Sequence, residues 1–371
     1  MYSEIVDERY KLITNLLMSG HTANFLDNIL AKLDGKLPID LIDAAYLLNN
    51  ADNIYIQKIV LSASMKYRRY YCNDVGFIVP IYFDTRCQNN CKYCGMASSN
   101  TVISRGKNNY KTFLEELDIL GELGYNTIEL VAGSVSYDLN LLRKMMSAIR
   151  AKGKSAAFCL DSLSTDEYKQ FATEKDTMIH FQETYNQDIY KKIHPLNTKK
   201  GNYNYRIDAV ERAILAGLKK VGLGILFGLN KFIEDVLMVI DHGKYLELKY
   251  NLKIKLIGIP RLQITAGCMS DFKGFEVSNQ ELLLAAALYR LAFPYAEMVA
   301  TTREDNNMIG DLLSHAATYT NFCCSLTPGG YKELKFGTFI DSQFQYHSPG
   351  YENIINIIES NKLVPNFKKS F

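Results

Sequence analysis

The chain has 371 residues, of which 47% are hydrophobic and 22% charged, an ordinary composition for a globular protein. Its 42 basic and 40 acidic residues leave a net charge of +2, which gives no support for binding to nucleic acid or to a membrane surface. The sequence shows neither a signal-peptide pattern at its start nor a run of about 18 apolar residues, so we expect a cytoplasmic protein.

The first part of the chain, residues 1–75, has apolar residues at helical spacing and predicts an N-terminal helical extension. From residue 76 onward, short apolar runs rich in β-forming residues alternate with longer amphipathic stretches. Because a parallel connection needs a crossover long enough to hold a helix, this alternation predicts β/α units. The candidate strands are 76–83, 127–132, 155–160, 177–181, 220–226, 253–258, 296–301 and 318–323.

Eight such units predict an α/β fold in which residues 76–330 form a TIM-type (β/α)8 barrel. The chemistry of such a barrel lies at the C-terminal ends of its strands. Residues 331–371 are predicted as a C-terminal extension of loop with one short helix, from Glu352 to Ser360.

A cluster of cysteines follows the first predicted strand. The segment DTRCQNNCKYCGM places Cys87, Cys91 and Cys94 at C-x3-C-x2-C spacing. Three thiolates can bind three irons of a 4Fe-4S cubane and leave the fourth iron open for chemistry. A structural zinc site would normally have four protein ligands, and no second Cys or His pair lies at zinc-finger spacing. The spacing therefore favours an iron-sulfur cluster, with zinc as the alternative.

This cysteine spacing, placed after a strand and followed by β/α units, resembles the radical S-adenosylmethionine (SAM) superfamily. The resemblance implies a 4Fe-4S cluster and SAM as cofactors. It also implies a small-molecule substrate, an external electron donor of the flavodoxin or ferredoxin type, and a 5'-deoxyadenosyl radical as the reactive species. Tyr93, between the last two cysteines, matches the aromatic residue that packs near the adenine in this family, although it could also be an ordinary loop aromatic.

Five further segments resemble, in the same order, segments of the aromatic amino-acid lyases, which include the tyrosine lyases of thiamine synthesis and of hydrogenase maturation. These segments are 180–195, 217–230, 259–267, 301–305 and 327–331. The resemblance implies cleavage of the Cα–Cβ bond of an aromatic amino acid, first of all tyrosine, which would give p-cresol and dehydroglycine (2-iminoacetate). The alternatives are a radical SAM reaction on tryptophan or another amino acid, and a metal-binding scaffold without catalysis.

Residues that would contact the cofactor follow from this resemblance. Glu183, at the end of the fourth predicted strand, can accept hydrogen bonds from SAM, or it could cap a helix. Ser134, in AGSVS, stands where tyrosine lyases have a glutamate near the methionine amino group. Gly222 and Gly224 could let the cofactor approach the backbone, or they could serve close packing of a strand.

Two arginines are candidates for binding the substrate. Arg303, after the seventh predicted strand, matches the family's arginine that grips the α-carboxylate, since a guanidinium binds a carboxylate in a planar, bidentate way. A surface salt bridge to Glu304 is the alternative. Arg261 is a second anion-binding candidate. Gln263 stands where tyrosine lyases tend to have another arginine, which weakens the prediction of tyrosine as the substrate.

Overall fold

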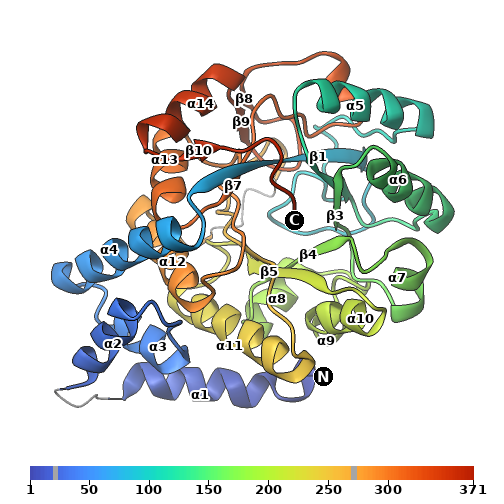
Figure 1. The fold of residues 1–371 in the computed structure, drawn as a ribbon. Helices are drawn as coiled ribbons and strands as arrows, with labels where there is room; N and C mark the ends of the chain where they lie inside the picture. Colours follow the sequence, from blue (N-terminus) through green and yellow to red (C-terminus); the bar gives the residue numbers. More distant parts are fainter. Residues whose placement is uncertain (20–23, 269–273) are drawn as a thin grey trace.

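A curled sheet of parallel strands forms the centre of the computed structural model, which describes residues 1–19, 24–268 and 274–371 (Figure 1). Neighbouring strands follow one another in chain order from β1 to β6, and β7 pairs with the other edge of β1. Helices surround this sheet, so the predicted (β/α) barrel architecture is confirmed. The strands are β1 (Asp74–Asp84), β2 (Thr127–Ala132), β3 (Ser155–Cys159), β4 (Thr177–Glu183), β5 (Lys220–Ile225), β6 (Leu256–Gly258) and β7 (Tyr319–Thr320).

The seventh predicted strand needs a correction, because residues 296–301 do not form a regular strand. Glu297 makes an isolated bridge to Leu256 of β6, and Val299 makes another to Tyr319 of β7. Each bridge therefore goes to a different neighbour, and neither continues into a ladder. The segment nevertheless links β6 to β7, and through β7 to β1, which brings the barrel round to its first strand.

Side chains alternate between the two faces of the strands, as the pleat requires. On β1, Val79 and Ile81 belong to the core between sheet and helices, whereas Pro80 and Tyr82 line an internal cavity. On β2, Glu129 lies on the cavity side. This alternation separates the residues that stabilise the barrel from those that can meet a ligand.

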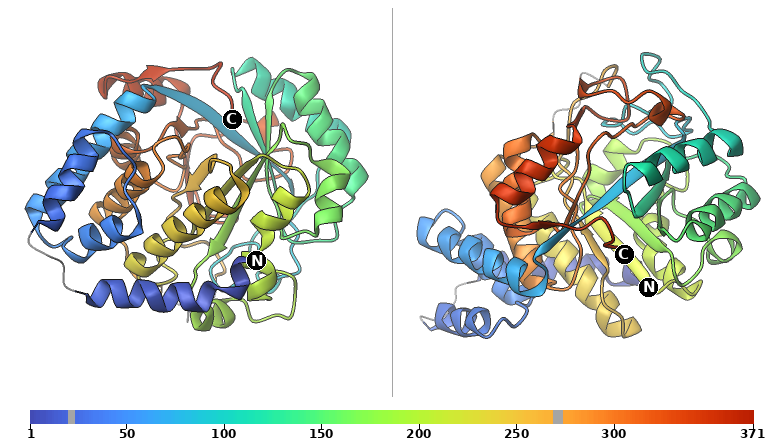
Figure 2. Two further views of the ribbon diagram at one scale, coloured as in Figure 1. Left: turned by 60° about the horizontal axis from the view of Figure 1, so that its bottom comes forward. Right: turned by 45° about the horizontal axis from the view of Figure 1, so that its top comes forward.

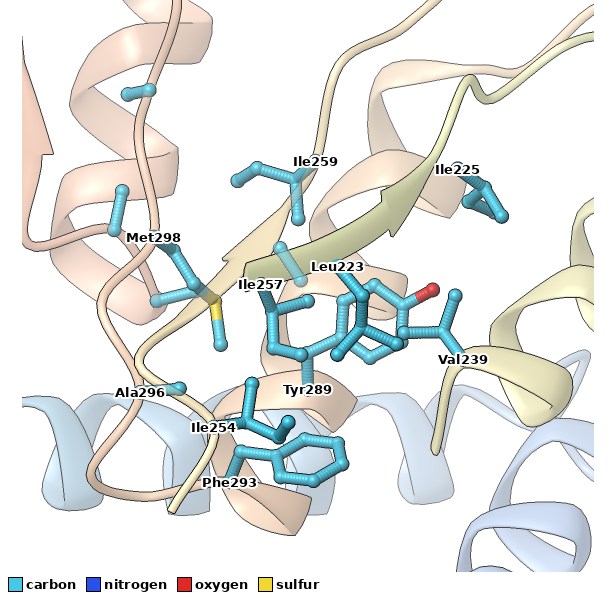
Figure 3. Close-up of a cluster of buried hydrophobic side chains, with 14 of the residues drawn as sticks. Leu223, Ile225, Val239, Ile254, Ile257, Ile259, Tyr289, Phe293, Ala296 and Met298 are labelled. Atoms are coloured by element: carbon cyan, nitrogen blue, oxygen red, sulfur yellow. The ribbon is translucent and has the colours of Figure 1, made fainter. Parts of the chain in front are cut away.

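Several outer helices begin at polar residues that accept hydrogen bonds from the first turn, as Asn109, Asp138 and Ser164 do. Figure 3 shows the apolar cluster that joins the sheet to these helices, with Leu223, Ile257 and Tyr289 among its members. The helices are α5 (Tyr110–Glu122), α6 (Leu139–Ala151), α7 (Thr165–Phe171), α8 (Gln187–Ile193), α9 (Tyr203–Ile207), α10 (Ala209–Leu215), α11 (Phe232–Tyr250), α12 (Asn279–Ala292) and α13 (Asn306–His315).

The N-terminal extension is helical, as predicted, and packs on one side of the barrel. Its helix α4 contacts α12 and α13, α1 contacts α11, and one apolar cluster continues from these helices into the barrel. Its elements are the 3-10 helix η1 (Tyr2–Glu4) and the helices α1 (Val6–Met18), α2 (Phe25–Asp34), α3 (Leu41–Asn49) and α4 (Ile54–Tyr71). Within the described ranges, each helix is either too short or too polar to cross a membrane.

The C-terminal segment returns to the barrel. It contains η2 (Gly330–Lys332), the antiparallel pair β8 (Gly337–Phe339) and β9 (Tyr346–Ser348), α14 (Tyr351–Ser360) and β10 (Val364–Pro365), which pairs with β1. The ring of Phe371 packs with Ile78, Ile179 and Leu256 inside the barrel, and Figures 1 and 2 show the end of the chain among the strands. Residue 371 thus helps to fill the base of the barrel, opposite the C-terminal ends of the strands.

Candidate active site

The cysteine loop follows β1 and opens onto the internal cavity, which all three cysteines line. The backbone amides of Asn89 and Ser134 each lie 3.4 Å from the sulfur of Cys87 and donate to it. The amide of Cys94 donates to the carbonyl oxygen of Cys91 at 3.2 Å. Hydrogen bonds to cysteine sulfurs are among the features that tune iron-sulfur clusters.

Neighbouring backbone holds this loop closely against the loop that follows β2. The amide of Gly133 donates to the carbonyl oxygen of Asp84 at 2.8 Å. The amide of Gln88 donates to the carbonyl oxygen of Ser134, also at 2.8 Å. A Cβ atom on Gly133 would lie 2.1 Å from the carbonyl oxygen of Arg86. Only glycine therefore allows the two loops to approach this closely.

The three cysteines fit a cubane better than a single metal ion. Burial raises the pKa of Cys91 to about 12 and also raises that of Cys94, and the neighbouring cysteines further oppose ionisation of these two thiols, so the two thiolates need a nearby positive charge. Among the residues that the structure describes, no group of three or more His, Cys, Asp or Glu side chains could hold one metal ion. In a cubane each thiolate binds a different iron, so the sulfurs need not converge on one point.

Tyr93 lines the same cavity, and a histidine holds it in place. Its hydroxyl lies 2.9 Å from Nε2 of His194, whose Nδ1 lies 3.0 Å from the carbonyl oxygen of Tyr190. A carbonyl oxygen can only accept, so Nδ1 carries the proton and Nε2 accepts from the tyrosine. Burial, together with the Lys200 ammonium, lowers the pKa of His194 to about 3 and keeps the ring neutral. His194 thus acts on the site through Tyr93.

Ser134 lines the cavity beside a carboxylate from the next strand. Its hydroxyl donates to the carboxylate of Asp161, which follows β3, and Asp161 also lies 3.3 Å from the Arg206 guanidinium. A carboxylate is therefore present at this edge of the cavity, although it comes from β3 rather than from the β2 position where tyrosine lyases carry it.

Glu183 ends β4 and also lines the cavity. Its backbone has a φ of +74°, a conformation that costs energy for a residue with a side chain and that clusters at functional sites. Its carboxylate lies 2.6 Å from the Lys200 ammonium and 3.9 Å from the Arg206 guanidinium. Burial alone would raise the pKa of Glu183, but these two cations outweigh it and lower the pKa to about 2.

Arg303 reaches the cavity without a salt bridge to any described carboxylate. Its guanidinium carbon lies 3.4 Å from the centre of the Phe344 ring, and Nη1 donates to the carbonyl oxygen of Arg261 at 3.4 Å. Burial lowers the pKa of Arg303. Glu304, the partner that the alternative interpretation required, pairs with Arg261 instead. Arg303 is thus a half-buried cation that faces the cavity and has no counter-ion among the described residues.

Arg261 lies outside this cavity and lines a neighbouring polar pocket. Besides its salt bridge to Glu304, it donates to the carbonyl oxygen of Val277 at 2.9 Å. The side-chain amide nitrogen of Gln263 donates to the carbonyl oxygen of Arg303 at 2.9 Å, so Gln263 holds the backbone of the Arg303 loop in place. The structure therefore brings one of the two predicted arginines to the cavity.

The structure also keeps Gly222 and Gly224 away from the cavity lining. A Cβ atom on Gly222 would lie 2.9 Å from Cβ of Leu256, and one on Gly224 would lie 2.8 Å from the carbonyl oxygen of Gly258. Both glycines thus allow β5 to lie close to β6, which is the packing role that the sequence left open.

Several cavity residues were missed from the sequence. Asp161, Lys200 and Arg206 belong to no motif, and a run such as KKGNYNYR resembles an ordinary solvated loop. Phe344 comes from the C-terminal extension, which carried no signal for a site. Glu129 did offer one, because it is a single acid within the apolar strand TIELVA.

Comparison with known proteins agrees with this geometry. Residues 81–242, which include the cysteine loop and the cavity residues of β2 to β4, match the model of the Radical SAM superfamily. These residues form a radical SAM domain. The predicted superfamily, its enzymatic character and its two cofactors, a 4Fe-4S cluster and SAM, are therefore confirmed.

Individual relatives of this radical SAM enzyme lie in the predicted branch. The chain is 28% identical over 322 residues to a 2-iminoacetate synthase of Salmonella typhimurium, covering 83% of this chain and 84% of the relative. It is 26% identical over 328 residues to the 2-iminoacetate synthase of Escherichia coli, with the same coverage. Its fold is similar to that of the FeFe-hydrogenase maturase HydG from Carboxydothermus hydrogenoformans, with a TM-score of 0.86, 24% identity and coverage of 98% of this chain and 84% of that one.

Proposed function

We propose that this radical SAM enzyme is a lyase that cleaves the Cα–Cβ bond of tyrosine and releases p-cresol and dehydroglycine. The observation that carries the proposal is Arg303, a half-buried guanidinium that faces the cavity and has no acidic partner within the described structure. A buried charge without a counter-ion is costly, so the site is suited to an anionic ligand. The α-carboxylate of an amino acid is such a ligand, and the similarity to 2-iminoacetate synthases supports tyrosine as that amino acid.

The cofactor would be held by this chain's own residues at the mouth of the cavity. In the proposal, Cys87, Cys91 and Cys94 hold the cluster, and Tyr93 packs beside the SAM adenine. When bound, the reduced cluster and SAM supply the radical that removes a hydrogen atom from the substrate amino group.

Charged residues at the mouth would receive the polar groups of SAM. Asp161, which accepts from Ser134, offers a carboxylate for the methionine amino group. Glu183 is ionised because two cations stabilise it, and it offers acceptors for the ribose hydroxyls.

The substrate would be held by its carboxylate against Arg303, while the ring extends into the apolar part of the cavity. Breaking the Cα–Cβ bond gives dehydroglycine and a 4-hydroxybenzyl radical, which needs one electron and one proton to become p-cresol. We propose a flavodoxin or ferredoxin as the electron donor and the cytoplasm as the location. The surrounding barrel excludes water from the reacting atoms.

The test is anaerobic turnover of the reconstituted enzyme with dithionite, SAM and tyrosine. We expect 5'-deoxyadenosine and p-cresol in mass-resolved chromatography. Deoxyadenosine without p-cresol would move the search to tryptophan and other amino acids. If an enzyme with a properly reduced cluster forms neither 5'-deoxyadenosine nor p-cresol, the proposal is wrong.

A further inference from the structure

Glu129 is a half-buried acid on the cavity side of β2. In the sheet register it lies between Pro80 of β1 and Ala157 of β3, below the level of the residues at the mouth. Among the described residues, it has no hydrogen bond or ion pair. Its carboxyl group is nevertheless partly accessible from the cavity. The acid is thus available to a ligand and is not used by the protein itself.

The surroundings of Glu129 make this arrangement costly. Most of the side chains that line this deeper part of the cavity are apolar: Ile78, Pro80, Val131, Ile179, Phe181, Leu256 and Val299. Burial among them raises the pKa of Glu129 to about 7. A buried polar group without a partner typically costs a few kcal/mol, so a residue of this kind is expected to find its partner in a ligand.

A second buried polar group lacks a partner in the same cavity. Asn321 follows β7, on the other side of β1 from Glu129, and its side chain is 6% exposed. Its amide oxygen has no hydrogen-bond partner in the described structure, and the residue lines the cavity. Two unsatisfied polar groups therefore flank the inner face of β1, within an otherwise apolar lining.

Tyr82 lies in the cavity between Arg303 and the deeper part around Glu129 and Asn321, which we call the floor. Tyr82, Glu129 and Arg303 line the same cavity, and Tyr82 follows Pro80, the β1 partner of Glu129, by two residues toward the cysteine loop. The Tyr82 hydroxyl is already occupied, because it donates to the amide oxygen of Gln343 at 2.6 Å. As far as the chain is described, one cavity thus has a cation without a counter-ion toward its mouth and an acid without a partner farther in, separated by an apolar wall.

We propose that Glu129 is a specificity-determining residue that forms a hydrogen bond with the phenolic hydroxyl of the tyrosine substrate. The inference rests on the proposed function: Arg303 holds the carboxylate, the apolar wall contacts the ring, and Glu129 meets the hydroxyl at the far end. The hydroxyl donates to the carboxylate, and the Asn321 side chain lies on the opposite side of the same floor. Phenylalanine fills the same space but leaves Glu129 without a partner, so the pocket discriminates against it.

The experiment compares tyrosine and phenylalanine in the reconstituted holoenzyme and in three variants: Glu129→Leu, Glu129→Gln, and Glu122→Leu as a matched control at an exposed glutamate of α5. For each, kcat/KM is measured from cresol or toluene release together with dehydroglycine. Binding of each amino acid to the SAM-loaded, unreduced enzyme is measured by calorimetry.

We expect Glu129→Leu to lower kcat/KM and affinity for tyrosine by about 10- to 100-fold, as for the loss of one hydrogen bond to a charged group, while phenylalanine is bound at least as well as before. Glu129→Gln, which still accepts a hydrogen bond, should retain most of the tyrosine affinity. KM for tyrosine should vary with pH near neutrality in the wild type and not in Glu129→Gln.

The outcomes separate this inference from the proposed function. If the wild type releases p-cresol but Glu129→Leu keeps the wild-type preference for tyrosine over phenylalanine, the role of Glu129 is wrong and the lyase assignment stands. If the wild type makes deoxyadenosine but no p-cresol, the proposed function fails first. Glu129-dependent binding of lysine or ornithine in place of tyrosine would overturn both, because the acid would then be the counter-ion of a basic side chain.

Discussion

The mouth and the floor of the cavity differ in whether their charged side chains have partners. At the mouth, Glu183 has Lys200, and Asp161 has both Ser134 and Arg206. On the floor, Glu129 has no partner within the described structure. The mouth is thus organised before any ligand arrives, which suits a cofactor shared by a whole superfamily, whereas the floor leaves its polar group for the variable part of the substrate.

The largest effect should come from the cysteine loop. Cys91→Ala removes one of the three thiolates that would hold the cluster, so we expect cluster content and deoxyadenosine formation to fall below detection. Iron and sulfide analysis and the electron paramagnetic resonance of the reduced enzyme measure this. Cys268→Ala, a cysteine outside the cavity lining, is the control. A fully loaded Cys91→Ala enzyme would contradict the assignment.

The two arginines offer the next comparison. Arg303→Met should lower kcat/KM for tyrosine by about 10- to 100-fold, because a charge-assisted contact to the carboxylate is lost. Arg261→Met should instead lower the Tm, because it leaves Glu304 buried without its counter-ion. Kinetics with tyrosine and thermal unfolding, measured on both variants, separate the roles. Equal changes in KM for tyrosine in the Arg303→Met and Arg261→Met variants would show that both arginines bind the substrate.

The organisation of the mouth can be tested by binding alone. Asp161→Asn should weaken SAM binding by about 10-fold, because the methionine amino group loses a charged acceptor. Ser134→Ala should have a smaller effect, since its hydroxyl orients Asp161. Equilibrium dialysis of the unreduced holoenzyme measures both, with Asp166→Asn on the exposed start of α7 as the control. Unchanged affinity in Asp161→Asn would place the amino group elsewhere.

Glu129, on the floor of the cavity, should make the free energy of unfolding depend on pH. The pKa of Glu129 is raised from 4.5 in the unfolded chain to about 7 in the fold, so the folded protein binds the extra proton between these values. Stability is therefore lost as the pH rises from about 4.5 to about 7. Without tyrosine, Glu129→Leu should gain roughly 1 to 3 kcal/mol more at pH 8 than at pH 5, measured by anaerobic unfolding. A gain that does not change with pH would contradict this.

Sequence reasoning identified those cavity-lining residues that a local pattern or the end of a predicted strand marks. The cysteine spacing and the position of Arg303 after the predicted strand 296–301 were readable, because the C-terminal ends of parallel strands share one rim and this segment, although it makes only isolated bridges, lies beside β6 and β7. Lys200, Arg206 and Phe344 were not, since they reach the cavity through loops whose course depends on the whole fold. Gly222 shows a further limit of sequence reasoning. A glycine can make room either for a ligand or for a neighbouring strand, and only the structure shows that the neighbour of Gly222 is Leu256 of β6.

The close approach at Gly133 has a consequence for engineering. Backbone hydrogen bonds join the cysteine loop to residues 133 and 134, and Gly133 has no room for a side chain. A graft of the cysteine motif into another barrel would therefore have to carry both segments, 84–94 and 133–134, as one transplanted unit. In natural sequences the same coupling should appear as paired change, in which a bulkier residue at position 133 is accompanied by a rebuilt cysteine loop.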